Sequence, residues 1–216
     1  MKVDPAAYVG AVVREVSTRE HQGQPARVVV ATRSYDTDIE DLWDALTNAE
    51  RIPRWFLPIS GEFRLGGRYQ FEGNAGGEIT RCEPPRLLSV TWEYGGGTSW
   101  LTVALSDNAA AGTRLELEHV APVDDAMWDR FGPGAVGVGW DLGLLGLALY
   151  LAGGAAFERS EAMAWSASDE GKAYMRASSE AWGEASIRAG TPAEAAKAAA
   201  ARTSAFYCGE PEPSGS

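Results

Sequence analysis

Residues 134–151 read GAVGVGWDLGLLGLALYL, and this stretch decides how the rest of the chain must fold. Pro133 stands directly before it, in the position that proline favours at the first turn of a helix. The stretch is apolar almost all round, so as a helix it must be buried on more than one side. Residues 134–157 are nearly free of charge and long enough to span a bilayer, and Gly139 and Gly143 have the G-x-x-x-G spacing of membrane helix pairs. Asp141 at its centre and the lack of flanking Lys or Arg favour a buried core helix instead.

The sequence before this helix has the pattern of an antiparallel meander. Brief alternating runs punctuated by glycine predict strands at residues 63–65, 68–73, 77–82, 87–94, 99–106 and 113–120. Residues 27–35 predict an earlier strand, and residues 39–46 and 48–55 predict two short helices. We therefore predict an α+β fold in which a twisted antiparallel sheet of six to seven strands wraps around the long apolar helix.

The register of one hairpin follows from its glycines. A two-residue Gly96-Gly97 turn predicts that Tyr94 pairs with Ser99 and Trp92 with Leu101, whereas a three-residue turn would split the aliphatic residues between faces. We prefer the two-residue turn, which leaves Trp100 on the opposite face. The residues that then share a face are Leu88, Val90, Trp92, Leu101, Val103 and Leu105.

The remaining segments divide the chain into a lead-in at residues 1–26, the main domain at 27–155, a helical extension at 156–208 and a disordered tail at 209–216. Val9, Val12, Val13 and Val16 in the lead-in have a helix-like spacing.

Two helices are predicted in the extension. The first covers residues 169–189 with Ser168 as its N-cap, and the second covers 192–206 behind a Thr191–Glu194 capping box. One side of the first helix must dock, either within the chain or in a homodimer; it carries Met175, Ser179, Trp182, Ser186 and Ala189.

Charge and cysteine content narrow the possible partners and compartment. A formal net charge of −11 makes nucleic acids and anionic membranes poor partners. Cys82 and Cys208 are distant and form neither a metal motif nor a redox pair, and the N-terminus lacks a secretory signal. We expect a cytoplasmic protein with no metal and no cofactor. The G-x-G-x-x-G string at residues 132–137 could mark a dinucleotide site, but it follows no strand and more simply starts the long helix.

Several short motifs together resemble a known family. They are LWDALT (42–47), ERIPRWF (50–56), GGRY (66–69), CEPPRL (82–87), VTWE (90–93), GTRL (112–115) with His119, and GWDLGL (139–144). The chain from residue 27 to 152 resembles the START-like (SRPBCC) superfamily, and within it the homologues of the activator of the heat-shock protein 90 ATPase. The resemblance implies a helix-grip (START/Bet v-like) fold with an apolar pocket. No stretch resembles the separate N-terminal domain of the eukaryotic chaperone activators.

The expected pocket residues come from the sheet, the short helices and the long helix: Trp55, Phe56, Tyr69, Phe71, Trp92, Leu101, Leu117, His119, Trp140, Asp141 and Leu144. Asp141 could anchor a ligand or pair with Arg64, Arg68 or a loop amide. We interpret His119 as structural or at the pocket rim, because alternation puts Glu116 and Glu118 on the other face, where they cannot orient it.

Three functions fit this reading. The first is a binding protein for a small apolar ligand such as a lipid, without catalysis. The second is an enzyme of the cyclase or aromatase kind that uses the same cavity. The third is a cochaperone-like domain that binds another protein, and the chain could act as a monomer or a homodimer in each case.

Overall fold

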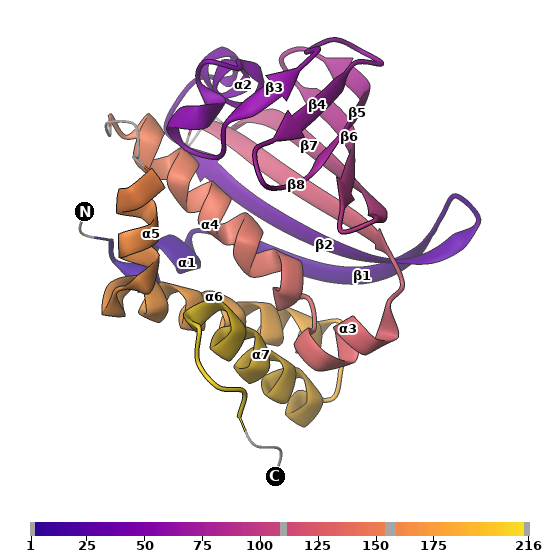
Figure 1. Ribbon diagram of the computed structural model, residues 1–216, viewed down its shortest axis with the longest axis vertical. Helices are drawn as coiled ribbons and strands as arrows, with labels where there is room; N and C mark the ends of the chain where they lie inside the picture. Colours follow the sequence, from indigo (N-terminus) through magenta and orange to yellow (C-terminus); the bar gives the residue numbers. More distant parts are fainter. Residues whose placement is uncertain (1–2, 109–111, 154–158, 214–216) are drawn as a thin grey trace.

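A computed structural model describes residues 3–108, 112–153 and 159–213. Its centre is one antiparallel sheet of eight strands in the order β1-β2-β8-β7-β6-β5-β4-β3 (Figure 1). The strands are β1 (Val13–His21), β2 (Gln24–Tyr35), β3 (Ile59–Gly61), β4 (Arg68–Phe71), β5 (Gly76–Glu83), β6 (Leu87–Tyr94), β7 (Gly97–Asn108) and β8 (Gly112–Pro122). The helices are α1 (Pro5–Gly10), α2 (Ile39–Thr47), the 3₁₀ turn η1 (Ile52–Arg54), α3 (Asp125–Phe131), α4 (Gly134–Leu151), α5 (Arg159–Ala167), α6 (Asp169–Arg188) and α7 (Ala193–Cys208).

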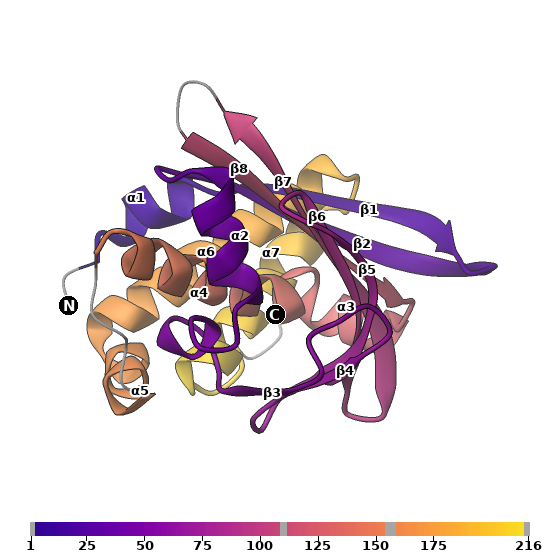
Figure 2. The ribbon, with the colours of Figure 1, turned by 90° about the horizontal axis from the view of Figure 1, so that it is seen from above.

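The sheet curls around α4, as the apolar sequence of this helix predicts (Figure 2). Leu144 and Leu147 on one side of α4 join the core that the strands and α2 build, while Leu145 on another side packs with Tyr174 of α6. Among the described residues α4 is the one helix long and apolar enough to cross a membrane. Its burial between the sheet and the C-terminal helices accounts for that composition, and the helix-grip prediction is confirmed.

Glycines on α4 allow its neighbours to approach closely. A Cβ atom on Gly137 would lie 2.3 Å from Cε2 of Trp182, and one on Gly146 would lie 2.5 Å from the carbonyl oxygen of Trp55. Gly139, which suggested a membrane pair in the sequence, faces the hydroxyl of Tyr207 on α7. These small residues therefore serve close packing within the chain.

The N-terminal segment does not form the helix that the spacing of its valines suggests. Only Pro5–Gly10 is helical, and β1 pairs along its length with β2 from Val13↔Thr32 to His21↔Gln24. Val12 is buried and Val13 is exposed, because the segment alternates as an edge strand does.

The sheet consequently has more strands than the six to seven expected. The strand predicted at residues 63–65 is wrong, because this segment forms the loop between β4 and the short β3 at Ile59–Gly61.

The β6–β7 hairpin turns at Gly95 and Gly96, whose φ values are +61° and +83°. This turn pairs Trp92 with Ser99 and Val90 with Leu101, so the predicted pairing is wrong by two residues. A shift of two keeps every side chain on its face. The shared face of the aliphatic residues is therefore as predicted, and Trp100 packs on the outer side with Val120.

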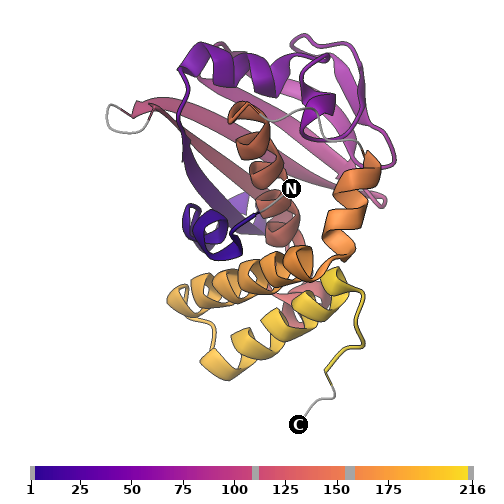
Figure 3. The same ribbon diagram turned by 90° about the vertical axis from the view of Figure 1, so that its left-hand side faces the viewer.

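Helices α6 and α7 form a second layer beneath the sheet and α4 (Figure 3). Ser168 caps α6 by accepting a hydrogen bond from Gly171 N at 3.2 Å, as predicted. The capping box at Thr191 is wrong, because Pro192 occupies the N-cap of α7 and the Thr191 hydroxyl instead accepts from Ser186 Oγ at 2.9 Å.

The face of α6 that carries Trp182 and Met175 docks within the chain, since both side chains are buried against the core. A homodimer through this face would first require α6 to leave α4. In the segment after α7, which we expected to be disordered, Glu210 contacts Arg176 at 2.5 Å, and residues 214–216 lie outside the described residues.

Candidate functional site

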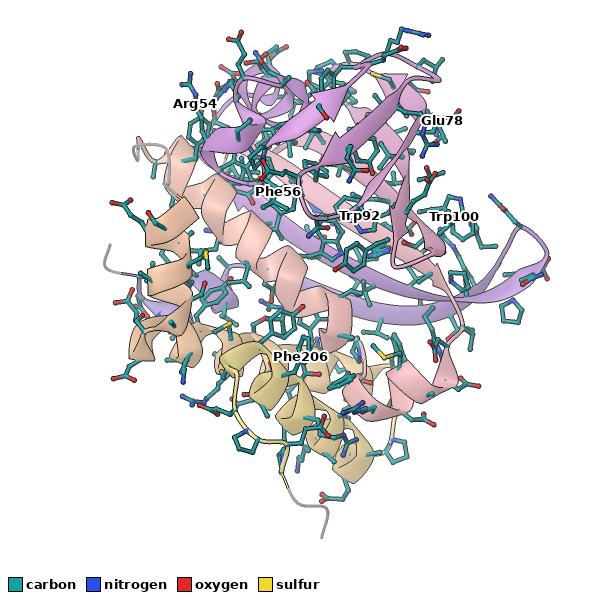
Figure 4. The ribbon with its side chains drawn as sticks, in the orientation of Figure 1. Arg54, Phe56, Glu78, Trp92, Trp100 and Phe206 are labelled. Carbon is teal, nitrogen blue, oxygen red and sulfur yellow. The ribbon has the colours of Figure 1, made fainter. Side chains whose placement is uncertain are left out.

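An apolar pocket of about 170 Å³ lies between α4, the α2–η1 segment, the β3–β4 loop and the concave face of the sheet. Phe56 and Trp92 lie in the space between α4 and the strands (Figure 4). Nine of the eleven predicted site residues line it: Trp55, Phe56, Tyr69, Phe71, Trp92, Leu101, Leu117, Trp140 and Leu144. His119 and Asp141 do not line it, and both have structural partners described below.

A continuous chain of aromatic rings forms much of the wall. Neighbouring rings meet edge to face or tilted, which is the favoured geometry of aromatic pairs. The centroid distances are 5.5 Å for Trp55–Phe56, 5.0 Å for Phe56–Phe71, 5.7 Å for Phe71–Trp92 and 4.9 Å for Trp92–Trp140. Each ring contacts the next, so the rings form one packed wall.

The polar groups of two wall residues form hydrogen bonds with the backbone. Trp55 Nε1 donates to the carbonyl of Ala45 at 2.9 Å, and the Tyr69 hydroxyl donates to the carbonyl of Thr91 at 2.7 Å. Burial raises the pKa of Tyr69, so its proton stays in this hydrogen bond. These two polar groups are therefore not free to bind a ligand.

His119 holds a third wall residue, Trp140, through a hydrogen bond. The Trp140 indole can only donate, so its 3.0 Å contact makes His119 Nδ1 the acceptor. The neutral ring then carries its proton on Nε2 and donates to Ser99 Oγ at 2.7 Å, and Ser99 in turn donates to the carbonyl of Trp92 at 3.1 Å. Burial lowers the pKa of His119 to about 4, which keeps this neutral form at physiological pH.

This arrangement does not match a Ser–His nucleophile and base. A general base must accept the serine proton, whereas here His119 donates to Ser99 and its other nitrogen is held by an indole. The prediction that His119 is structural fits this geometry. The ring is not part of the pocket lining, and its place among the ligand contacts stays a prediction.

Asp141 lies on the side of α4 that faces β1 and α6, and it is completely buried. Its Oδ2 accepts from Arg14 Nη2 at 2.8 Å, Arg14 Nε at 3.0 Å, Ser178 Oγ at 2.5 Å and Trp182 Nε1 at 3.2 Å. Burial raises the pKa of Asp141, and the Arg14 guanidinium opposes that rise. This ion pair joins β1, α4 and α6 and is a structural element.

The partners that we predicted for Asp141 are wrong. Arg64 pairs with Glu62, and Arg68 pairs with Glu93. The true partner is Arg14, which lies in strand β1. The spacing of the valines in this segment suggested a helix instead.

Sequence reasoning also missed part of the lining. Trp43, Leu46 and Ile52 reach the pocket from α2 and η1, and Phe63 and Arg64 reach it from the β3–β4 loop. Val90 and Val103 could have been found, because they share a strand face with Trp92 and Leu101. The loop residues carry no periodic signal. Within the described part of the chain, no group of three or more His, Cys, Asp and Glu side chains could hold a metal ion.

An antiparallel sheet that grips a long helix with an apolar pocket between them defines the START-like, helix-grip class of proteins. Residues 36–152 match the family model described as "Activator of Hsp90 ATPase homolog 1-like protein". The chain belongs to this family.

Solved structures agree with that assignment. The crystal structure of CalU16 from Micromonospora echinospora is 32% identical, with a TM-score of 0.65 over 81% of this chain and 98% of that chain. The solution structure of CalU16 gives 31% identity and a TM-score of 0.67 over 83% and 97% of the two chains. DynU16, from the dynemicin biosynthetic locus, shares the fold at 23% identity and a TM-score of 0.53, over 60% of this chain and 48% of that chain. No curated protein matches the chain.

Proposed function

We propose that this protein binds a small apolar ligand in the pocket between α4 and the sheet. The observation that carries the proposal is the packed aromatic wall, in which the polar groups of Trp55, Tyr69 and Trp140 are hydrogen-bonded within the protein. An apolar ligand on such a surface gains binding free energy from dispersion contacts and from the release of water. The surface contributes little to the binding of a polar molecule.

The size of the pocket limits what it accepts without rearrangement. An apolar protein cavity of about 150 Å³ accommodates benzene, whereas sites for drug-sized ligands are about 300–1,000 Å³. At about 170 Å³ this pocket fits one or two fused rings, or the end of a longer chain. A larger ligand would leave its remainder at the rim, beside the β3–β4 loop.

The contacts favour binding over the cyclase or aromatase alternative. Proton transfer to a bound substrate needs a titratable group within reach of the reacting atoms. Neither His119 nor Asp141 lines the pocket. His119 is hydrogen-bonded to Trp140 and Ser99, and Asp141 is paired with Arg14. Arg64 is the one residue with a charged side chain among the described residues that line the pocket, and an arginine does not lose its proton.

Native mass spectrometry of the purified protein, followed by extraction under denaturing conditions, tests the proposal. We expect a stoichiometric apolar molecule in the native spectrum or, if the pocket is empty, a rise in melting temperature with naphthalene. If nothing copurifies and neither naphthalene nor 1-dodecanol changes the melting temperature, the proposal is refuted. Binding to a chaperone, which the family name suggests, would then be the preferred function. The exposed Phe63 and Leu65 on the β3–β4 loop would make the contact.

A further inference from the structure

The pocket has one charged side chain on its lining, and it is positive. Arg64 stands in the β3–β4 loop next to the lining residue Phe63, which is 43% exposed, so both lie where the pocket meets the solvent. The remainder of the lining is apolar or aromatic, apart from Thr47 and Cys82.

Several donors of the interior wall are already used by the protein. Those of Trp55, Tyr69 and Trp140 are committed to acceptors within the chain. A buried polar group without a partner costs about 1–3 kcal/mol, so a ligand with one polar end gains by leaving that end at the rim. At the rim the end meets the guanidinium of Arg64.

We propose that the natural ligand is an apolar or aromatic carboxylic acid, bound with its apolar body in the pocket and its carboxylate on Arg64. This inference rests on the proposed function and assigns a chemical class to the ligand. A guanidinium presents a planar pair of N–H donors that matches a carboxylate in a bidentate contact.

Arg64 forms an ion pair with Glu62. The two side chains meet at 2.5 Å, and they are 70% and 65% exposed. An exposed pair of this kind contributes little stability, so an incoming carboxylate can replace Glu62. The net charge of −11 opposes an anionic ligand only weakly at physiological salt, where the Debye length is about 8 Å and distant charges are screened.

The test compares two probes of similar shape, 2-naphthylacetate and 2-(2-naphthyl)ethanol, by isothermal titration at pH 7. We measure the ratio of their dissociation constants in the wild type and in Arg64→Gln. The acid should be favoured about threefold to fivefold more in the wild type than in Arg64→Gln, as expected for an exposed charge pair. Glu62→Gln should strengthen the binding of the acid, because it frees Arg64, and should leave the binding of the alcohol unchanged.

Arg68→Gln is the matched control. It makes the same change in net charge on an exposed side chain of the neighbouring strand β4, outside the pocket lining. The inference is overturned if Arg64→Gln leaves the acid-to-alcohol ratio unchanged, or if Arg68→Gln changes it equally. Binding of the alcohol without a preference for the acid would refute the ligand class alone, whereas failure of both probes to bind any variant would refute the pocket.

Discussion

Replacing Arg14 with Met tests the buried ion pair that joins β1, α4 and α6. The substitution keeps an unbranched apolar stem but leaves Asp141 buried without a counter-charge, and it removes two hydrogen bonds from Arg14 Nη1 to the carbonyls of Val9 and Val12. Removing one partner of a buried pair costs about 3–5 kcal/mol. For a chain of this length, each kcal/mol lowers the melting temperature by about 2–4 °C.

The loss of stability in Arg14→Met should be larger at pH 7 than at pH 5. Burial already raises the pKa of Asp141, and without Arg14 the folded-state pKa rises further above the unfolded value. A carboxyl of this kind costs stability as the pH rises through its folded pKa, so Arg14→Met should recover stability when the pH falls from 7 towards 5.

Urea unfolding followed by tryptophan fluorescence at both pH values measures this effect. The double variant Arg14→Met/Asp141→Leu serves as the control and should recover most of the loss at pH 7, because apolar residues can replace a buried pair. A loss below about 1 kcal/mol for Arg14→Met, or no recovery in the double variant, would refute the reasoning.

Two further substitutions test the core and the pocket wall. His119→Phe should flatten the pH dependence of stability. Because the His119 pKa is about 4, the wild type loses about 3 kcal/mol of stability as the pH falls from 6.5 towards 4. Urea titrations at several pH values that give both proteins the same pH dependence would contradict this. Gly137→Ala should cost about 1–3 kcal/mol in thermal unfolding, because its Cβ would lie 2.3 Å from the Trp182 ring. Gly139→Ala, which gains the same helix propensity but meets only the Tyr207 hydroxyl at 3.3 Å, should cost less; a smaller loss for Gly137→Ala would count against the packing argument.

The long helix made most of the fold predictable. A stretch that is apolar on all sides has few places to lie in a chain of this composition, and the glycine-punctuated runs before it supplied the sheet. Strand faces were also predictable, because a two-residue error in the β6–β7 register does not change which side chains point inward.

The features that escaped prediction depend on contacts between distant segments. The partner of Asp141 lies 127 residues away, in an edge strand whose valines happen to have helical spacing. Alternation put His119 on the inner face, but only the structure shows that both ring nitrogens are engaged by Trp140 and Ser99. Arg64 and Phe63 reach the pocket from a loop, and loops carry no periodicity from which to predict their direction.

A titration of naphthalene into the wild type and into Gly143→Leu tests the central claim most directly. Gly143 lines the pocket opposite Phe56, and a Leu side chain there would extend into the space that the ligand needs. We expect saturable one-to-one binding to the wild type and at least a tenfold loss of affinity in a folded Gly143→Leu, since about 1.4 kcal/mol suffices for that change. Equal affinity in the two proteins, or no binding to the wild type, would contradict the assignment of this pocket as the ligand site.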